Sequence, residues 1–421
     1  METTVSDIAS DCAATKVASR TLAFAPTEVK NRALDSIAAG LRDRTDAILE
    51  ANAADLADER AQGLSDALTD RLSLDRARVE AMAEGVEAVA ALEDPVGEVL
   101  ETRNLESGIE LSKVRVPLGV VAVVYEARPN VTIDCAVLTI KSGNAILLRG
   151  SSYAERTNRA LAEVVRDGLS DAGLPADSVV LSTGGGRDQL AELATQEGVI
   201  DLLIPRGGEG LKNALRDVAT VPVMYAASGN CHVYVNSEAD LDMAAAIIVN
   251  AKVSRPGVCN AAETLLVDQS IATEFLPTAL SELQDAGVEL VGDERVVAAS
   301  DGIEVAPAED SDWDTEFLDL KLAVGIVDDL DAAIEHVNNH GSGHSEAIVT
   351  RSEEAARRFT TEVDAAAVYV NASTRFTDGF EYGMGAEIGN STQKLHARGP
   401  IGLRELTTFK YIGRGDGQIR A

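Results

Sequence analysis

The feature that most constrains the fold is a series of short apolar runs, rich in Val, Ile and Leu, that begins near residue 119. Between them lie amphipathic stretches long enough to be helices, such as 154–169 and 240–253. Apolar strands that alternate with helices are typical of a parallel sheet covered on both faces. We therefore predict an α/β fold. The expected strands are 119–125, 145–148, 179–181, 199–205 and 221–225 in a first series, and 231–235, 263–267, 322–327, 346–350 and 366–370 in a second.

The two series predict two doubly wound parallel-sheet lobes, residues 1–228 and 229–403, which meet near 226–230. Two polar segments fit neither lobe. Residues 98–115 are expected to form a protruding hairpin, and the C-terminal segment 404–421 is expected to contain a lone strand. Strands of this kind commonly pair with others in an assembly, so we expect them to build a small oligomerisation arm. The chain is therefore predicted to form a homo-oligomer, a dimer or a tetramer.

The overall composition excludes several classes of protein. Hydrophobic residues make up 45% and charged residues 25% of the 421 positions, which excludes wholesale disorder. The longest apolar run, 116–125, is about half the ~20 residues that a membrane helix needs. The first residues are acidic and polar, unlike a signal peptide. We expect a cytoplasmic protein that does not enter the membrane.

The charge balance is strongly negative: 69 acidic residues against 37 basic ones give a net charge of −32. Such a chain repels nucleic acids and anionic lipids, so neither is expected as a partner. Excess carboxylates are typical of adaptation to a very salty cytoplasm, where screening shortens their mutual repulsion. An ordinary acidic mesophilic protein is the alternative.

Cysteine and histidine usage predicts no metal site. His340 and His344 have the spacing of a metal pair, but glycines at 341 and 343 argue against the helix that such a pair needs. No CxxC pair occurs, so neither a disulfide framework nor a thiolate metal site is expected in a cytoplasmic protein. The four cysteines are Cys12, Cys135, Cys231 and Cys259.

Cys259 is the candidate nucleophile. It lies in the segment SRPGVCNAAETLLV, where Pro256 and Gly257 force a turn between a helix and a strand. Arg255 is nearby, and a thiol in a loop beside a cation has what a lowered pKa requires. The local sequence alone leaves open the alternative that Cys259 is a small buried hydrophobic residue.

Other clusters are candidates for ligand binding. The glycine clusters at 181–190 and 204–215 each lie between a strand and a helix, where backbone N–H groups can approach a phosphate. Tight turns also use glycine, so both interpretations remain open. The basic clusters YEARPN (125–130) and STQKLHARGP (391–400) indicate either an anionic ligand or counterions for neighbouring acids.

Longer motifs add a resemblance from about residue 20 to the C-terminus. They include VVYEARPNVTIDCAVLTIKSGNAILLRGS, LIPRGGEGL, NAKVSRPGVCNAAETLLV, HSEAIVT, VYVNASTRFTDG and GAEIGNSTQKLHARGPIGLRELTTFKYIG. With these the chain resembles the γ-glutamyl phosphate reductases, or glutamate-5-semialdehyde dehydrogenases, a branch of the aldehyde dehydrogenase superfamily. The resemblance implies an aldehyde-dehydrogenase-like fold and the second step of proline biosynthesis from glutamate.

The resemblance also implies a mechanism. Cys259 matches the family's nucleophile, which attacks L-glutamate 5-phosphate, releases phosphate and forms a thioester. Hydride from NADPH then gives L-glutamate 5-semialdehyde. Asn130 of YEARPN matches the side-chain donor to the oxyanion. The family's substrate comes from glutamate 5-kinase, which is expected here as a separate chain.

One departure from the superfamily is informative. Hydrolytic aldehyde dehydrogenases carry a glutamate base where this chain has MYAASGN (224–230), which contains no carboxylate. Without that base, water is not activated to release the acyl group, which favours the reductase. The alternatives are a hydrolytic NAD(P)-dependent aldehyde dehydrogenase and a non-catalytic dinucleotide-binding scaffold.

The remaining assignments follow from motif position in the family. Ser152 replaces the acid that NAD-preferring members carry, so NADPH is expected. Glu263, which opens a strand, is interpreted as structural. The expected cofactor-binding residues are Arg149, Ser151, Ser152, Arg206, Gly207, Gly208 and Glu316. The expected substrate-binding residues are Arg128, Arg255, Lys394, His396 and Arg398 for the phosphate and α-carboxylate, and Thr374, Arg375 and Phe376 for the amino-acid end.

Overall fold

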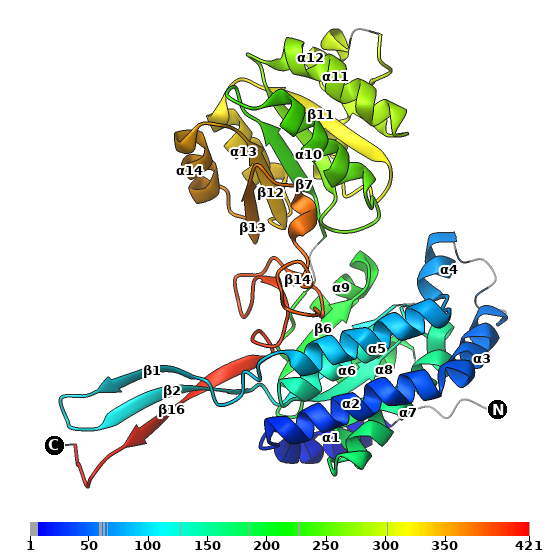
Figure 1. The fold of residues 1–421 in the computed structure, drawn as a ribbon, viewed down its shortest axis with the longest axis vertical. Helices are drawn as coiled ribbons and strands as arrows, with labels where there is room; N and C mark the ends of the chain where they lie inside the picture. The colour runs from blue at the N-terminus through cyan, green and yellow to red at the C-terminus, as the bar shows by residue number, and fades with distance from the viewer. Residues whose placement is uncertain are drawn as a thin grey trace. The chain divides into compact units, whose positions relative to one another are not determined.

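The computed structural model describes residues 7–58, 61, 64, 66–126, 128–184, 186–225, 228–300 and 302–420. The chain divides into two compact units. Unit 1 comprises Met1–Tyr225, Gly383–Gly389 and Ile401–Ala421, and unit 2 comprises Ala226–Tyr382 and Asn390–Pro400. Each unit contains its own parallel sheet with helices around it (Figure 1). The predicted α/β fold class is therefore confirmed.

The sheet of unit 1 has four parallel strands in the order β5-β4-β3-β6. The central strand β3 is buried at every position, as its unbroken apolar sequence predicts. The prediction of a strand at 221–225 is wrong. This segment makes only an isolated bridge between Leu203 and Val223. Pro222 lacks the backbone N–H that would extend the ladder. The bounds are β3 (Val120–Tyr125), β4 (Ala145–Arg149), β5 (Val179–Leu181) and β6 (Leu202–Arg206).

Along the sequence, the first helices of unit 1 come before the strands of the sheet, and the later helices alternate with those strands. The long helix α2 packs against α5 and α7. Their bounds are α1 (Ile8–Leu22), α2 (Thr27–Asp43), α3 (Thr45–Leu56), α4 (Asp66–Leu72), α5 (Arg76–Ala91), α6 (Asn130–Lys141), α7 (Glu155–Asp171), α8 (Arg187–Ala194) and α9 (Glu209–Arg216).

The sheet of unit 2 has seven parallel strands in the order β10-β9-β11-β8-β7-β12-β13. Two of them, β9 and β10, are absent from the predicted series because they are short and carry too few apolar residues to stand out. The strands are β7 (Cys231–Val235), β8 (Ala262–Asp268), β9 (Glu289–Gly292), β10 (Ala306–Pro307), β11 (Lys321–Val327), β12 (Ser345–Val349) and β13 (Ala367–Val370). The helices are α10 (Leu241–Val253), α11 (Ala272–Asp285), α12 (Glu294–Ala299), α13 (Leu330–His340) and α14 (Glu353–Glu362).

A separate antiparallel sheet forms an arm on unit 1. The hairpin of β1 (Val99–Asn104) and β2 (Glu110–Pro117) pairs with β16 (Thr407–Arg414), and β2 is the middle strand. Figure 1 shows these three strands as a long, narrow sheet that extends from the α/β body of the unit. The hairpin and the C-terminal strand thus pair with each other within one chain.

The chain returns to unit 1 earlier than the predicted lobe boundary at 403. Residues 383–389 and 401–403 group with unit 1, where Ile388 and Ile401 are buried and Ile401 donates a backbone hydrogen bond to Gly389 at 2.7 Å. Between them, β14 (Asn390–Ser391) and β15 (Gly399–Pro400) form a short antiparallel pair in unit 2. The sequence marks no compositional break at these crossings. Within the described ranges, no helix is long and apolar enough to cross a membrane.

Candidate functional site

Cys259 lies in the loop between α10 and β8 and is partly exposed. The other three cysteines, all in described parts of the chain, are buried, and burial raises their pKa values. The pKa of Cys12, for example, is raised to about 12. Because the thiolate is the nucleophilic form, Cys259 is the cysteine of this chain suited to attack a ligand.

The backbone of Cys259 is held from the side of β7. The Cys231 thiol donates to the carbonyl oxygen of Cys259 at 3.2 Å. Gly229 packs so closely on the same carbonyl that an added Cβ would overlap it. The backbone N–H of Gly229 in turn donates to Oε1 of Glu316 at 2.8 Å. These contacts fix the position of the residue that carries the thiol.

The neighbouring residue Asn260 is held by the turn at 374–377. Its Nδ2 donates to the carbonyl oxygens of Arg375 at 3.2 Å and Thr377 at 3.0 Å. The Thr374 hydroxyl donates to the carbonyl of Asn260 at 2.7 Å. The Arg375 guanidinium donates to Oδ1 of Asn260 and, through Nε, to the Ser254 hydroxyl at 3.1 Å. Arg375 therefore bonds residues on both sides of Cys259.

Two guanidinium groups contribute positive charge to this loop. Burial lowers the pKa of Arg375, and the like charge of Arg255 lowers it further, whereas Asp378 and Cys259 raise it. Arg255 itself is exposed. A thiol beside two cations is favoured as the thiolate, and an anionic leaving group is stabilised there as well.

A buried ion pair joins the two ends of the Cys259 loop. Nζ of Lys252, at the end of α10, lies 2.5 Å from Oε2 of Glu263 in β8, and both side chains are fully buried. Burial lowers the pKa of Lys252 and raises that of Glu263 to about 7. Glu263 also accepts a hydrogen bond from the backbone of Leu318 at 3.3 Å. This position favours the interpretation of Glu263 as structural.

The other expected substrate residues of unit 2 differ in accessibility. Thr374 is fully buried and its hydroxyl is used by Asn260, so in this structure it supports the loop rather than facing a ligand. Phe376 is 48% exposed. Lys394 and Arg398 both bind Asp364, at 2.6 and 2.9 Å, which is the counterion role left open by the sequence. His396 is exposed near them.

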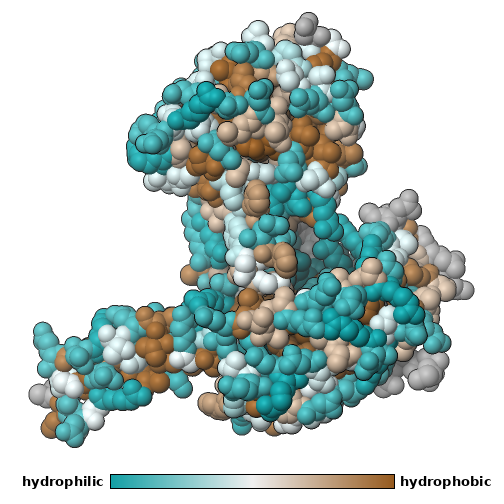
Figure 2. Space-filling model, viewed as in Figure 1, coloured by the Kyte–Doolittle hydropathy of each residue, from teal (hydrophilic) through white to brown (hydrophobic). Residues whose placement is uncertain are grey.

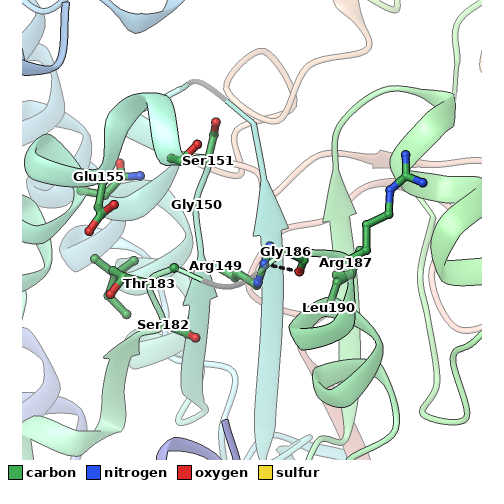
Figure 3. Close-up of a pocket in the computed structure, with 13 residues that line it drawn as sticks. Arg149, Gly150, Ser151, Glu155, Ser182, Thr183, Gly186, Arg187 and Leu190 are labelled. Atoms are coloured by element: carbon green, nitrogen blue, oxygen red, sulfur yellow. Dashed lines mark hydrogen bonds between the residues drawn. The ribbon is translucent and has the colours of Figure 1, made fainter. Parts of the chain in front are cut away.

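Unit 1 contains a pocket of about 480 Å³ at the carboxyl ends of β4 and β5. Ligands of doubly wound sheets bind at such strand ends. The structure brings Arg149, Ser151 and Ser152 together here. Arg149 and Ser151 are labelled in Figure 3. The full lining is Arg149, Gly150, Ser151, Ser152, Glu155, Asn158, Leu181, Ser182, Thr183, Gly184, Gly186, Arg187 and Leu190.

The chemistry of this pocket suits a polar, anionic ligand. Arg149 donates to the carbonyl of Gly186 at 3.0 Å, and burial lowers its pKa (Figure 3). Among the described residues, Nδ2 of Asn158 and Oγ of Ser182 are buried without a hydrogen-bond partner. Buried polar atoms are normally paired, so these two fit groups that a ligand would bring. The wall formed by residues 183, 184, 186 and 187 is missing from the predicted cofactor residues, although the glycine cluster at 181–190 marks it.

The expected phosphate loop follows β6 and lies outside this pocket's lining. Arg206 ends β6, and Gly207 and Gly208 precede α9. The N–H of Gly208 donates to Oε1 of Glu126 at 3.1 Å, so a carboxylate of the chain itself sits at this helix start. Glu316 belongs to unit 2, where its Oε1 accepts the hydrogen bond from the backbone N–H of Gly229.

The expected oxyanion donor Asn130 opens α6 and is exposed on unit 1. Its Nδ2 donates to Oδ2 of Asp134, one helical turn later, at 2.9 Å. Arg128 lies just before it and is partly buried. In the segment 224–230, Ala226 and Ala227 lie outside the described residues. Across the described part of the chain, no three His, Cys, Asp or Glu residues are grouped to hold a metal ion.

Comparisons with known proteins agree with this architecture. The profile of the aldehyde dehydrogenase family matches residues 1–297 and 322–412. The γ-glutamyl phosphate reductase of Desulforamulus reducens is 52% identical over 405 residues, 96% of this chain and 97% of that protein. That of Heliobacterium modesticaldum is 53% identical over 394 residues, 94% of each. The crystal structure of the Thermotoga maritima γ-glutamyl phosphate reductase superposes with a TM-score of 0.96 at 45% identity, covering 99% of this chain and 100% of that one. The chain therefore belongs to the aldehyde dehydrogenase family, in the branch of the γ-glutamyl phosphate reductases.

Proposed function

We infer that this enzyme reduces L-glutamate 5-phosphate to L-glutamate 5-semialdehyde with release of phosphate, the second step of proline synthesis from glutamate. The observation that carries this conclusion is the Cys259 loop, in which a partly exposed thiol is fixed by its backbone and flanked by Arg255 and Arg375. Relatives about half identical over nearly the whole chain bear the name of the same reductase.

In the first half-reaction, Sγ of Cys259 attacks the acyl carbon of the substrate. The new C–S bond gives a tetrahedral oxyanion, which collapses as the C–O bond to phosphate breaks and leaves a thioester and free phosphate. We assign Arg255 to the leaving phosphate. We assign Arg375 to it as well, in place of the amino-acid end expected from the sequence, because both guanidinium groups lie at this loop. The Asn130 amide is the proposed donor to the tetrahedral oxyanion, and loss of such a donor costs ~3 kcal/mol of barrier.

In the second half-reaction the thioester becomes an aldehyde. NADPH, when bound, supplies the hydride. The residues of the chain stabilise the second oxyanion, again through Asn130, and accept the electron pair of the breaking C–S bond on Sγ of Cys259. The segment 224–230 offers no carboxylate to activate water, so hydrolysis of the thioester is slow.

We propose NADPH as the cofactor, bound by unit 1. Arg149, Ser151 and Ser152 line the pocket whose unpartnered Asn158 and Ser182 atoms fit a polar ligand. Arg149 is the residue that we propose to bind the 2′-phosphate. The further cofactor contacts proposed are Arg206, Gly207 and Gly208 with the phosphates and Glu316 with the nicotinamide ribose.

We propose Arg128, together with Lys394, His396 and Arg398, for the carboxylate end of the substrate. For Lys394 and Arg398 this requires a ligand to compete with Asp364, whose pKa they hold below its ordinary value. Phe376 is proposed to line the amino-acid end. Thr374 acts through Asn260 instead.

We further propose that the arm joins copies of this chain into a dimer or tetramer. Val99, Phe409 and Tyr411 expose apolar surface on it, and Figure 2 shows hydrophobic patches along the arm. The outer edges of β1 and β16 pair with no described strand, and such edges recruit partners. Glutamate 5-kinase is proposed as a separate chain in the same cytoplasm.

The net charge of −32 supports the proposal that this enzyme works in concentrated salt. Activity should fall steeply at low ionic strength as the carboxylates repel one another. Full activity in dilute buffer would contradict this proposal. The assay below is therefore run in molar KCl.

The test follows the reverse reaction as NADPH absorbance. Glutamate semialdehyde and NADP are supplied with and without inorganic phosphate, to wild type and to Cys259→Ala. We expect NADPH formation only with both phosphate and Cys259. Turnover without phosphate would instead identify a hydrolytic dehydrogenase, and binding of NADP without any turnover would identify a non-catalytic scaffold.

A further inference from the structure

Asp134 is an acidic residue at the proposed oxyanion donor that the mechanism above does not use. It lies one turn after Asn130 on α6, and its Oδ2 accepts a hydrogen bond from Nδ2 of Asn130 at 2.9 Å. It is partly buried, and Arg206 at the end of β6 lies near enough to influence its charge. A carboxylate is thus held directly against the amide nitrogen.

The chemistry of an amide makes this contact directional. The two ends of an Asn side chain are similar in shape, but the nitrogen donates and the oxygen accepts hydrogen bonds. A carboxylate accepts only, so it attracts the nitrogen of Asn130 and repels its oxygen. One N–H of Asn130 is used by Asp134, and the second N–H of the same nitrogen remains to serve an oxyanion.

Without the carboxylate, this preference disappears. A flipped amide would present its oxygen where the second N–H belongs, and an oxygen repels an oxyanion. An asparagine at position 134 would be nearly isosteric, yet it can donate as well as accept, so it stabilises both orientations of Asn130. The charge of residue 134, rather than its size, therefore decides the orientation of the Asn130 amide.

The electrostatics of the site agree with an ionised Asp134 at neutral pH. Burial raises the pKa of Asp134 to about 6, while the hydrogen bond from Asn130 and the charge of Arg206 lower it. Above this value the side chain carries the negative charge that attracts the amide nitrogen of Asn130.

We propose that Asp134 is a positioning residue, which fixes the Asn130 amide with its nitrogen toward the reacting oxygen. The proposal rests on the proposed function, because it needs Asn130 to serve an oxyanion. A purely structural alternative is that the hydrogen bond merely stabilises the first turn of α6.

A double-mutant cycle separates these roles. The variants are Asp134→Asn, Asn130→Ala and the combination, assayed with glutamate semialdehyde, NADP and phosphate in molar KCl. We expect Asp134→Asn to lower kcat about tenfold with the KM for NADP unchanged, and Asn130→Ala to lower kcat about 100-fold. The double variant should match Asn130→Ala alone, because the group that Asp134 positions is already gone.

Independent effects that multiply in the double variant would overturn the proposal, as would full activity of Asp134→Asn. Asp134→Ser is measured in parallel, so that a folding failure of one variant, seen by circular dichroism, leaves the cycle intact. Asp134→Glu, which keeps the charge, should recover part of the lost kcat. If wild type proves independent of phosphate, the proposed function fails first; if wild type behaves as expected and the cycle is additive, only the role of Asp134 fails.

Discussion

The pocket of unit 1 and the Cys259 loop of unit 2 use polar groups in opposite ways. In the pocket, Asn158 and Ser182 keep buried polar atoms that meet no partner among the described residues. In the loop, Asn260 uses its amide and its carbonyl, and Cys259 uses its carbonyl, in contacts within the unit. The region that must bind a ligand thus keeps polar atoms without hydrogen bonds. The region that must hold one sulfur atom in place has its polar groups hydrogen-bonded within the unit.

This difference predicts two kinds of kinetic effect. Substitutions in the loop should displace the nucleophile and lower kcat, because small errors in position are costly for a reacting atom. Substitutions in the pocket should weaken binding of the cofactor and raise its KM. Substitutions of each kind therefore test this division between effects on kcat and effects on KM.

The largest effect is expected from Gly229→Ala. The new Cβ would overlap the carbonyl of Cys259, so the loop must shift, and kcat should fall by at least about 100-fold. The matched control is Gly257→Ala, in the Cys259 loop itself, where the nearest atom to a new Cβ is the Leu318 carbonyl oxygen at 3.7 Å. Steady-state kinetics of both variants decide the matter: equal losses would show that the loop tolerates neither change and that Gly229 has no special role.

Arg375→Gln should have the next largest effect. It removes the charged bonds to Ser254 and Asn260 and one of the two cations near Cys259. Charged hydrogen bonds contribute about 1.5–3 kcal/mol, so kcat should fall about 10- to 100-fold. The pH dependence of iodoacetamide labelling should also show a higher pKa for Cys259. An unchanged labelling profile would assign Arg375 to loop structure alone.

The apolar pattern of the sequence predicts the long buried strands but not the short or interrupted ones. Strand β3 is apolar throughout and β8 contains the apolar run 265–267, so both parallel sheets are visible in the pattern. Strands β9 and β10 are short, and Pro222 interrupts the expected strand at 221–225, so these details depend on pairing that local pattern does not encode.

For the candidate site, residue type and family motif single out Cys259, Asn130 and Arg149. The supporting contacts are not visible in this way, because they join segments far apart in the chain. Asn260 is bound by Thr374, 114 residues away, and Cys259 by Cys231, 28 residues away. Such pairings arise only when the strands are in register.

Acid should affect unit 2 through three histidines, of which His232 and His344 are buried and His336 is partly buried. Burial lowers the pKa of His232 and His336 to about 3 and that of His344 to about 4. Their unfolded pKa is near 6.5, so the stability they contribute is present above that value and is lost as pH falls below it. Glu346 opposes this in part, because its pKa is raised well above the ordinary value.

Between pH 6.5 and 5, the free energy of unfolding should therefore fall by about 2 kcal/mol less in His344→Leu than in wild type, at about 1.4 kcal/mol per pH unit. Denaturant unfolding followed by the fluorescence of Trp313, the single tryptophan and a residue of unit 2, measures it. His396→Gln, at an exposed position, is the control and should keep the wild-type slope. A steeper slope for His344→Leu would mean that the buried imidazole is already charged in the folded state.

The smallest effect is expected in the pocket, from Arg149→Gln. Loss of one charged contact to a 2′-phosphate should raise the KM for NADPH about tenfold. The KM for NADH, which lacks that phosphate, should stay unchanged, and so should kcat at saturating cofactor. The NADH measurement is thus an internal control for the architecture of the pocket. Equal increases for both cofactors would mean that Arg149, which also bonds Gly186, supports the wall formed by residues 183, 184, 186 and 187 rather than binding the phosphate. A fall in kcat would instead contradict the division between pocket and loop, because a residue of the pocket would then act on the reacting atoms.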